Sequence, residues 1–364
     1  MRSYSLLLTV LLFASGCATR VSIDVSREVL SLRPYQPSLP EGEYQYILWY
    51  PENRFLVFQY DGLYNGSVEY TLPDRAEWTE LPLQKDGRCS FSRYYVNSIL
   101  PDGRLGLIHH CYGRWPENDQ LHRNGYYLAA YDWESGLLEQ VVEKPLSNRR
   151  TPGYYSWNPD MTRGIQQVNG NRGTLWWITP EGTKPLTVTL KDGSRSWVLA
   201  DNVAIMESTD DEIYFNEYDV GTARSPAWSS DGQKIAFLAS LDAYGRSGLA
   251  RILSEYKLYL MDPQTLEPQA VLEGIYEPGG LFWSPDSEWV AFSAGLDSFQ
   301  TRYLILFSPS QKRMYLVPGN FGSLAWSPTG TEIAAIHCLA EACRKSEVLV
   351  YSFQKVLRGA DTRE

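Results

Sequence analysis

The sequence repeats a motif in which a tryptophan ends one apolar stretch, a tight turn follows, and a second apolar stretch begins. The clearest copies are PAWSSDGQKIAFLAS at 226–240, LFWSPDSEWVAFSAG at 281–295 and LAWSPTGTEIAAIHC at 324–338. Their tryptophans are 55 and 43 residues apart. Repeats of this length are typical of a supersecondary unit that stacks on copies of itself. The chain is therefore constrained to a repeat architecture.

Each copy predicts four antiparallel strands. An apolar strand ends at the tryptophan, a turn rich in Pro, Asp and Gly reverses the chain, and alternation such as Ile235 and Phe237 marks the second strand. A third strand and a fourth follow, as in YKLYLMDPQTLEPQAVLEG at 256–274. Aromatic residues make up 13% of the chain, which also favours strands. Four antiparallel strands per repeat indicate an all-β fold built from β-propeller blades.

Fainter copies at 47–62, 96–111 and 154–170 extend the repeat upstream. The sequence thus predicts six blades, at about 44–88, 89–148, 149–222, 223–276, 277–320 and from 321 onward. Seven are possible, because 191–222 could be a stunted blade. The last blade has only three strands, and we expect 27–34 to close the ring by pairing with 348–353.

The repeat positions have structural roles in this interpretation. Each tryptophan fills the wedge between neighbouring blades, and the turn residues reverse the chain without needing ladder hydrogen bonds. The residues assigned to these roles are Trp157, Trp228, Asp231, Gly232, Trp283, Pro285, Asp286, Trp326 and Pro328.

The stretch 226–262, with its Trp-Ser-Ser-Asp-Gly turn, Ile-Ala-Phe strand and Leu-Tyr-Leu-Met-Asp strand, resembles the TolB-type propeller repeat. The copy at 280–309 is also a close match. The resemblance implies a propeller and a habit of binding partners. TolB also carries a leading α/β domain, which we do not expect here because blade sequence begins about 27 residues after Cys17.

The N-terminus predicts export. Arg2 precedes an apolar run from Leu6 to Ala14, which is too short to span a membrane. Ala-Ser-Gly-Cys at 14–17 resembles the bacterial lipoprotein cleavage box, with Cys17 as the lipid-bearing residue; the alternative is an ordinary signal with a chance cysteine. We expect a signal peptide at 1–16, a lipidated linker with the closing strand at 17–43, and the propeller at 44–364. Ala18 favours the outer membrane, facing the periplasm, in a cell that has one.

Export places the other four cysteines in an oxidising compartment, where they can pair. Cys338 and Cys343 bracket a short connection after a predicted strand, so we expect one disulfide between them. Cys89 and Cys111 would form the second. The alternative is four buried or free thiols.

The predicted topology places the long connections on one face of the ring. These are 112–125, 191–222, 240–255 and 338–346. Loops on a rigid scaffold often carry recognition, so we expect this face and the central funnel to bind a partner; the alternative is tolerated surface elaboration. The candidate partner-binding residues are Arg114, Trp115, His122, Arg123, Tyr244, Arg246 and Arg251.

The sequence contains no nucleophile elbow, zincin helix or phosphate-binding loop. His110 and His122 are the pair to suspect for a funnel metal, but the adjacent His109 and His110 would point to opposite sheet faces. The acidic run at 207–219 lacks calcium-loop spacing. We therefore expect no metal or cofactor. A net charge of −10 argues against nucleic acid and against membrane contact other than through the lipid.

The prediction is an envelope-anchored propeller lipoprotein that binds another envelope protein, a peptide or a glycan, or acts as a scaffold. Two alternatives remain. One is a polysaccharide or peptide hydrolase or lyase, which would need two carboxylates or three histidines converging in the channel. The other is a passive structural lipoprotein, which a funnel plugged by apolar side chains would favour.

Overall fold

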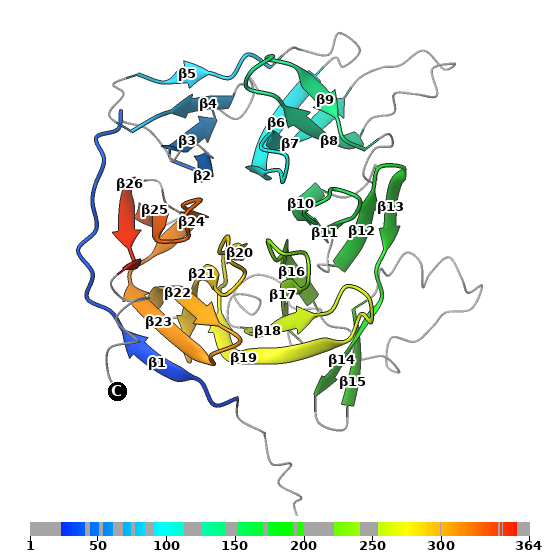
Figure 1. Cartoon of the computed structure of the whole chain (residues 1–364), viewed down its shortest axis with the longest axis vertical. Coiled ribbons are helices and arrows are strands. Elements are labelled where there is room, and N and C mark those ends of the chain that lie inside the picture. Colours follow the sequence, from blue (N-terminus) through cyan, green and yellow to red (C-terminus); the bar gives the residue numbers. More distant parts are fainter. Residues whose placement is uncertain are drawn as a thin grey trace, which may run out of the picture.

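The computed structural model describes residues 23–40, 44–50, 54–60, 68–73, 77–83, 91–112, 125–142, 151–169, 174–192, 195–199, 222–240, 254–298, 300–340, 343 and 345–354. All 26 elements named among these residues are strands, which confirms the all-β class. No helix in this part of the chain has the length and apolar character to cross a membrane. The strands form a ring around a central axis, in the manner of a propeller (Figure 1).

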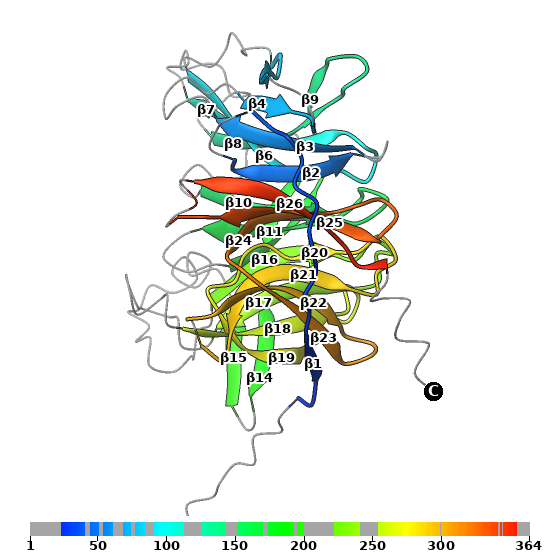
Figure 2. The same ribbon diagram turned by 90° about the vertical axis from the view of Figure 1, so that its left-hand side faces the viewer.

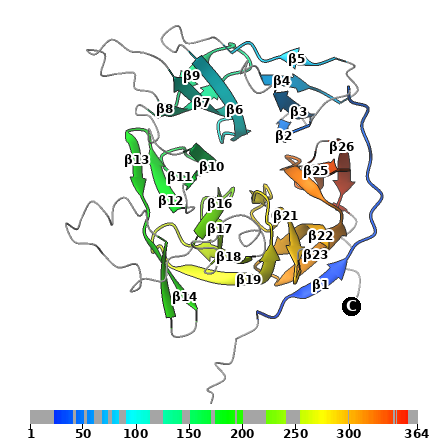
Figure 3. The same cartoon turned by 180° about the vertical axis from the view of Figure 1, so that it is seen from behind.

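The first three sheets are four-stranded antiparallel blades in which chain order is also spatial order. In each of them the first strand lies nearest the axis (Figures 1 and 3). Their strands are β2 (Tyr46–Tyr50), β3 (Arg54–Tyr60), β4 (Val68–Thr71) and β5 (Thr79–Glu80); β6 (Phe91–Ile99), β7 (Leu105–Tyr112), β8 (Gly125–Tyr131) and β9 (Leu138–Gln140); β10 (Thr151–Trp157), β11 (Gly164–Asn169), β12 (Thr174–Thr179) and β13 (Gly182–Pro185).

A nine-stranded sheet follows, made of two antiparallel runs of four strands and one added strand. The two runs are joined through only two residue pairs, Ile275 with Leu296 and Tyr276 with Gly295. The strands of this sheet are β16 (Thr222–Trp228), β17 (Ile235–Ser240), β18 (Glu255–Met261), β19 (Pro268–Tyr276), β20 (Phe282–Trp283), β21 (Val290–Leu296), β22 (Arg302–Ser308), β23 (Arg313–Pro318) and the added β1 (Ser26–Val29).

The remaining strands form two small sheets. One is the three-stranded sheet of β24 (Phe321–Trp326), β25 (Glu332–Cys338) and β26 (Ser346–Ser352). The other is a hairpin of β14 (Val188–Asp192) and β15 (Arg195–Leu199), which overlaps the segment that could have been a stunted blade. Of that segment, 193–194 and 200–221 lie outside the described residues.

The predicted count of six or seven separate four-stranded blades is not what the described residues form. They contain four sheets with four or more strands: the three four-stranded blades and the nine-stranded sheet. The count differs because β19 pairs with β21, which merges two runs into one sheet, and because the last sheet has no fourth strand among the described residues.

The prediction that 27–34 pairs with 348–353 is also wrong. Residues 23–40, called here the N-terminal strap, instead place β1 parallel to β23, with Ser26 opposite Arg313 and Val29 opposite Leu316. Among the described residues of the strap, only Tyr35 pairs with the backbone of the last sheet, where it exchanges two hydrogen bonds of 2.8 Å with Val350. Prolines at 34 and 37 flank Tyr35 and have no N–H to donate, so a continuous strand cannot form there. Figure 2 shows the strap as the blue trace along the outside of the ring.

The ring closes instead through packing between its first and last sheets. Ile47 and Val57 of the first sheet lie in one buried cluster with Ala334 and Ile336 of the last. Leu39 of the strap packs against the same cluster. The strap therefore lies across the seam between sheets rather than completing a blade.

Each tryptophan turn is held by its own side chains. In the turn at 283–289, Ser284 Oγ donates to Asp286 and accepts from the Trp289 N–H at 2.9 Å. Asp286 Oδ1 accepts from the Glu288 N–H at 3.1 Å. The turn at 228–234 repeats this pattern with Ser229 and Asp231. The residue that follows the aspartate has a positive φ, 71° at Gly232 and 60° at Ser287, which explains the preference for glycine there.

Leu30 tests whether the strap stabilises the ring. Its side chain is 8% exposed and lies in the cluster that joins β21–β23 to β24–β26. We expect Leu30→Ala to lower the free energy of unfolding by about 2–4 kcal/mol, because a buried leucine is replaced by a cavity. The neighbouring Val29 is 62% exposed, and Val29→Ala should change the free energy of unfolding by less than about 0.5 kcal/mol. Urea denaturation of both variants measures this, and equal effects would show that the strap is not part of the core.

Candidate functional site

A cavity of about 610 Å³ lies on the ring axis, at the end where the tryptophan turns are found. It is lined by residues from β2, β6 and β10 of the first three blades, from β16 and β20, the innermost strands of the two runs in the nine-stranded sheet, and from β24 of the last sheet. A site built from so many strands is held by the whole ring. Its shape therefore depends on how the inner strands are fixed relative to one another.

The lining of this cavity contains no Asp, Glu, Lys, Arg or His among the described residues. Trp157, Trp228, Trp283 and Trp326 contribute to it and are 5–8% exposed. Exposed prolines stand at its edge, as at Pro285 and in the equivalent turns. The cavity therefore offers aromatic rings, proline rings and neutral polar groups, which suit an uncharged ligand group.

Several polar side chains of the lining already have partners. Asn97 Nδ2 donates to the Tyr155 carbonyl at 2.9 Å, and Ser225 Oγ donates to the Gly279 carbonyl at 3.2 Å. Ser230 Oγ donates to the Ser284 carbonyl at 3.0 Å. These groups fix the wall of the cavity more than they offer hydrogen bonds to a ligand.

A second cavity, of about 750 Å³, lies along the opposite ends of three of the same inner strands. It is lined by Tyr44, Gln45 and Tyr46 before and in β2, by 277–280 before β20, and by 320–323 at the start of β24. Phe282 lines both cavities. The two cavities therefore adjoin at β20, and the second also extends between sheets to Ser293, Arg302 and Ile336.

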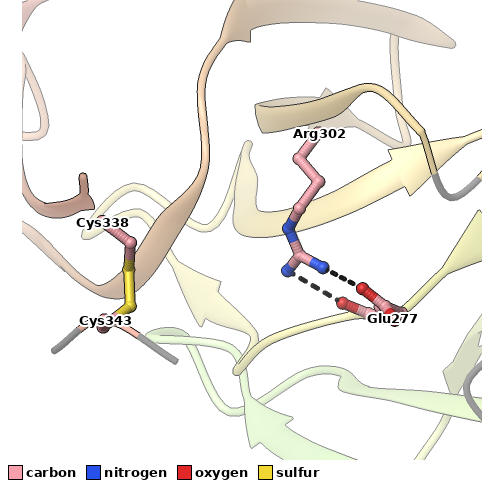
Figure 4. The surroundings of a disulfide bond; sticks show 4 residues. All are labelled: Glu277, Arg302, Cys338 and Cys343. Carbon is pink, nitrogen blue, oxygen red and sulfur yellow. Dashed lines mark hydrogen bonds and ion pairs between the residues drawn. A yellow bond between two sulfur atoms is a disulfide. The ribbon is translucent and has the colours of Figure 1, made fainter. Parts of the chain in front are cut away.

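An ion pair and a disulfide stand at this second cavity (Figure 4). Arg302 donates to the Glu277 carboxylate at 2.6 Å and to the Glu277 carbonyl at 3.1 Å. Glu277 has a φ of 45° and precedes a proline, a strained combination that the two contacts with Arg302 hold in place. Cys338 and Cys343 are joined by a disulfide, and Cys343 lines the cavity.

The inner strands are tied to one another by hydrogen bonds between a side chain and a neighbouring backbone. Asn97 joins β6 to β10, and Ser156 Oγ accepts from the Trp228 N–H at 3.0 Å to join β10 to β16. Ser323 Oγ accepts from the Ile47 N–H at 3.3 Å, which joins β24 to β2 across the closing seam. These ties fix the positions of the strands that line the channel.

Two tryptophans make the same tie at equivalent positions. Trp283 Nε1 donates to the Ala227 carbonyl, and Trp326 Nε1 donates to the Phe282 carbonyl, both at 3.1 Å. Each acceptor directly precedes the tryptophan of the previous repeat. The tryptophan of the motif thus acts as a hydrogen-bond donor between neighbouring inner strands as well as an apolar filler. The repeat motif predicted only the role of apolar filler.

The described part of the chain includes the predicted repeat-turn residues and three of the four cysteines expected to pair. The predicted partner-binding residues all lie outside it, as do Cys17, Cys89 and the acidic run at 207–219. Cys111 is buried at the end of β7 and takes part in a disulfide, but its predicted pairing with Cys89 stays a prediction. Sequence reasoning missed Glu277 and Arg302, because a lone charged pair 25 residues apart carries no local pattern.

The histidines do not converge on a metal site within the described residues. His109 stacks on Tyr94 with centroids 4.4 Å apart, and His110 stacks on Tyr126 at 4.2 Å. His337 pairs with Glu347 at 3.0 Å. No group of three or more His, Cys, Asp or Glu side chains suitable for a metal occurs in the part of the chain that the structure describes.

Comparison with known proteins gives similarity at the level of the fold. No protein family matches the sequence, and no curated protein matches it either. Solved structures that are similar include TolB from Acinetobacter baumannii, with 12% identity, a TM-score of 0.47 and coverage of 86% of this chain and 62% of that one. The putative TolB from Agrobacterium tumefaciens has 13% identity and a TM-score of 0.46, covering 85% and 90%. An oligogalacturonate lyase in complex with manganese has 11% identity and a TM-score of 0.44, covering 89% and 96%.

The tryptophan ties can be tested with two matched substitutions. Trp283→Phe removes the donor to Ala227, whereas the buried Trp228 Nε1 has no hydrogen-bond partner among the described residues. We expect Trp283→Phe to lower the free energy of unfolding by about 1 kcal/mol more than Trp228→Phe, because one carbonyl loses its partner. Chemical denaturation of the two variants measures the difference. Equal losses would mean that only the ring volume matters.

Asp231 predicts a dependence of stability on pH. Burial raises the pKa of its carboxyl, but hydrogen bonds from Ser229 and the Gln233 N–H outweigh this, so the pKa lies below its usual value. A lowered folded-state pKa contributes stability above the unfolded-state pKa of about 4, which is lost as pH falls through the folded value. The stability advantage over Asp231→Asn should therefore be largest at pH 7 and shrink below about pH 4. Thermal melts of both proteins between pH 7 and 3 measure it, and a constant difference would contradict this.

Proposed function

We propose that the protein is an envelope-anchored β-propeller lipoprotein that binds a partner or ligand along its central channel. The observation that carries the proposal is the cavity of about 610 Å³ on the ring axis, framed by the inner strands, with a second cavity of about 750 Å³ adjoining it at Phe282. Cavities of this size suit a peptide segment or a small ligand. A wall fixed by hydrogen bonds between strands costs little to order when a ligand binds.

The chemistry of the two ends differs, which supports recognition of a specific partner. The end with the tryptophan turns is lined by neutral side chains, and the other end carries Glu277 and Arg302. Neither end is filled by its own side chains, which argues against a passive structural role. The long loops remain proposed contacts around the second cavity.

The anchor is the second part of the proposal. It rests on the sequence around Cys17, and the Cys338–Cys343 disulfide supports an oxidising compartment. Attachment to one surface would concentrate the ring where its partner lies, so even a weak interaction would be effective. The proposed partner is another envelope protein, a peptide or a glycan.

Affinity capture from cross-linked envelopes tests the binding role. At the tryptophan-turn end, Pro285→Lys would place a charge beside the neutral cavity, and at the other end Gln45→Lys would do the same. Leu137→Lys, at a position that is 54% exposed away from both cavities, is the matched control. We expect capture to be lost with one of the first two variants and kept with the control, because burying an unpaired charge at the contact is costly.

Two further sets of substitutions locate the contact on the loops. They are alanine at Arg114, Trp115 and Arg123, and alanine at Tyr244, Arg246 and Arg251. Loss of capture with either set would extend the site to the loops that were predicted from sequence. If nothing specific is captured, or if capture ignores all these changes, binding along the channel is wrong. The channel would then be examined for hydrolysis or cleavage of polysaccharides and peptides.

A further inference from the structure

The N-terminal strap joins the fold at the outer edge of the ring, away from both ends of the channel. Val25 packs against the cluster formed by β16–β23, and β1 pairs with β23. Arg27 forms an ion pair with Asp297. Figures 1 and 3 show β1 on the outside of the ring, across the axis from β9. The chain between Cys17 and the fold therefore starts at this edge.

The length of that connection limits how far the edge can lie from an anchoring surface. Ile23 is the first described residue and is six residues after Cys17. A fully extended chain spans at most about 3.3–3.6 Å per residue, so the connection reaches about 20 Å. A chain of this length folds to a diameter on the order of 50 Å. The connection is thus short compared with the ring.

The balance of basic and acidic residues differs between this edge and the face that carries the tryptophan turns. Basic residues slightly outnumber acidic ones near β1 and at the end of the connection from β22 to β23. The basic residues are Arg27, Arg33, Lys312 and Arg313, and the acidic ones are Asp24, Glu28 and Asp297. Four of the turns around the neutral cavity instead carry an exposed carboxylate, at Asp102, Asp160, Asp231 and Asp286, and together with Glu288 these acidic residues outnumber the basic Arg104, Arg163 and Lys234 of the same turns. Anionic lipid headgroups would repel that face and tolerate the edge.

We propose that the outer edge formed by β1 and β23 is the surface that faces the membrane. This inference rests on the lipid anchor proposed above. The ring stands on its edge, so β8 and β9 point away from the lipid and the channel runs along the membrane plane. A partner would then reach either end of the channel from the side, without passing between the ring and the lipid.

Energy transfer to labelled lipid tests this orientation in the full-length lipidated protein. Val29→Cys and Leu137→Cys place a fluorophore on the two opposite edges, at positions that are 62% and 54% exposed. Both proteins would be reconstituted into vesicles of phosphatidylethanolamine and phosphatidylglycerol that contain rhodamine lipid. We expect transfer from position 29 to exceed that from 137 at least about twofold, because the far edge is about one ring diameter further away. The protein without an introduced cysteine, labelled in the same way, gives the background. The Cys17→Ser variant has no lipid and should show no transfer.

Mass spectrometry of the mature N-terminus separates the two proposals. If Cys17 carries lipid and transfer is greater from 29, the edge-on orientation is supported. Equal transfer from the two positions would mean that the ring lies flat on the membrane. Greater transfer from 137 would mean that the opposite edge faces the lipid. Either result overturns the proposed orientation and leaves the proposed anchor intact. If Cys17 carries no lipid, the anchor and the orientation both fail.

Discussion

The structure depends on the hydrogen bonds that tie each innermost strand to its neighbour around the ring. Sheets in a ring contact each other mainly through apolar side chains, which have no directional preference and permit sliding. The ties through Asn97, Ser156, Trp283, Trp326 and Ser323 add direction at five junctions around the axis. They fix where each inner strand stands, so they also fix the wall of the channel.

Closure of the ring illustrates why these ties matter. The first and last sheets share no strand, and their seam consists of an apolar cluster, the Ser323 tie and the strap outside it. The strap pairs with β23 through β1, bonds to the backbone of Val350 at Tyr35, and packs into the seam at Leu39. The same segment that holds the seam also leads to the proposed anchor. The proposed attachment and the closure of the ring therefore involve one short stretch of chain.

The two ends of the channel follow from opposite features of the same repeat. At one end the turns recur with nearly fixed sequence, so Ser and Asp satisfy the turn backbone and leave a neutral, proline-edged cavity. At the other end the connections vary, and a single strained residue, Glu277, meets Arg302 beside a disulfide. Regular sequence thus built a general apolar surface, and irregular sequence supplied the specific charged groups.

The sequence by itself determined the all-β class, the strands of each repeat and the positions of the tryptophan turns, because alternation and turn chemistry are local. It also placed Cys338 and Cys343 on a connection short enough to be bridged. Only the tertiary structure decided that β19 joins β21, that β1 lies parallel to β23, and that Glu277 meets Arg302. These are contacts between segments far apart in the chain or at sheet edges, where several partners satisfy the same backbone groups. The choice among them depends on packing of the whole ring, which no local pattern encodes.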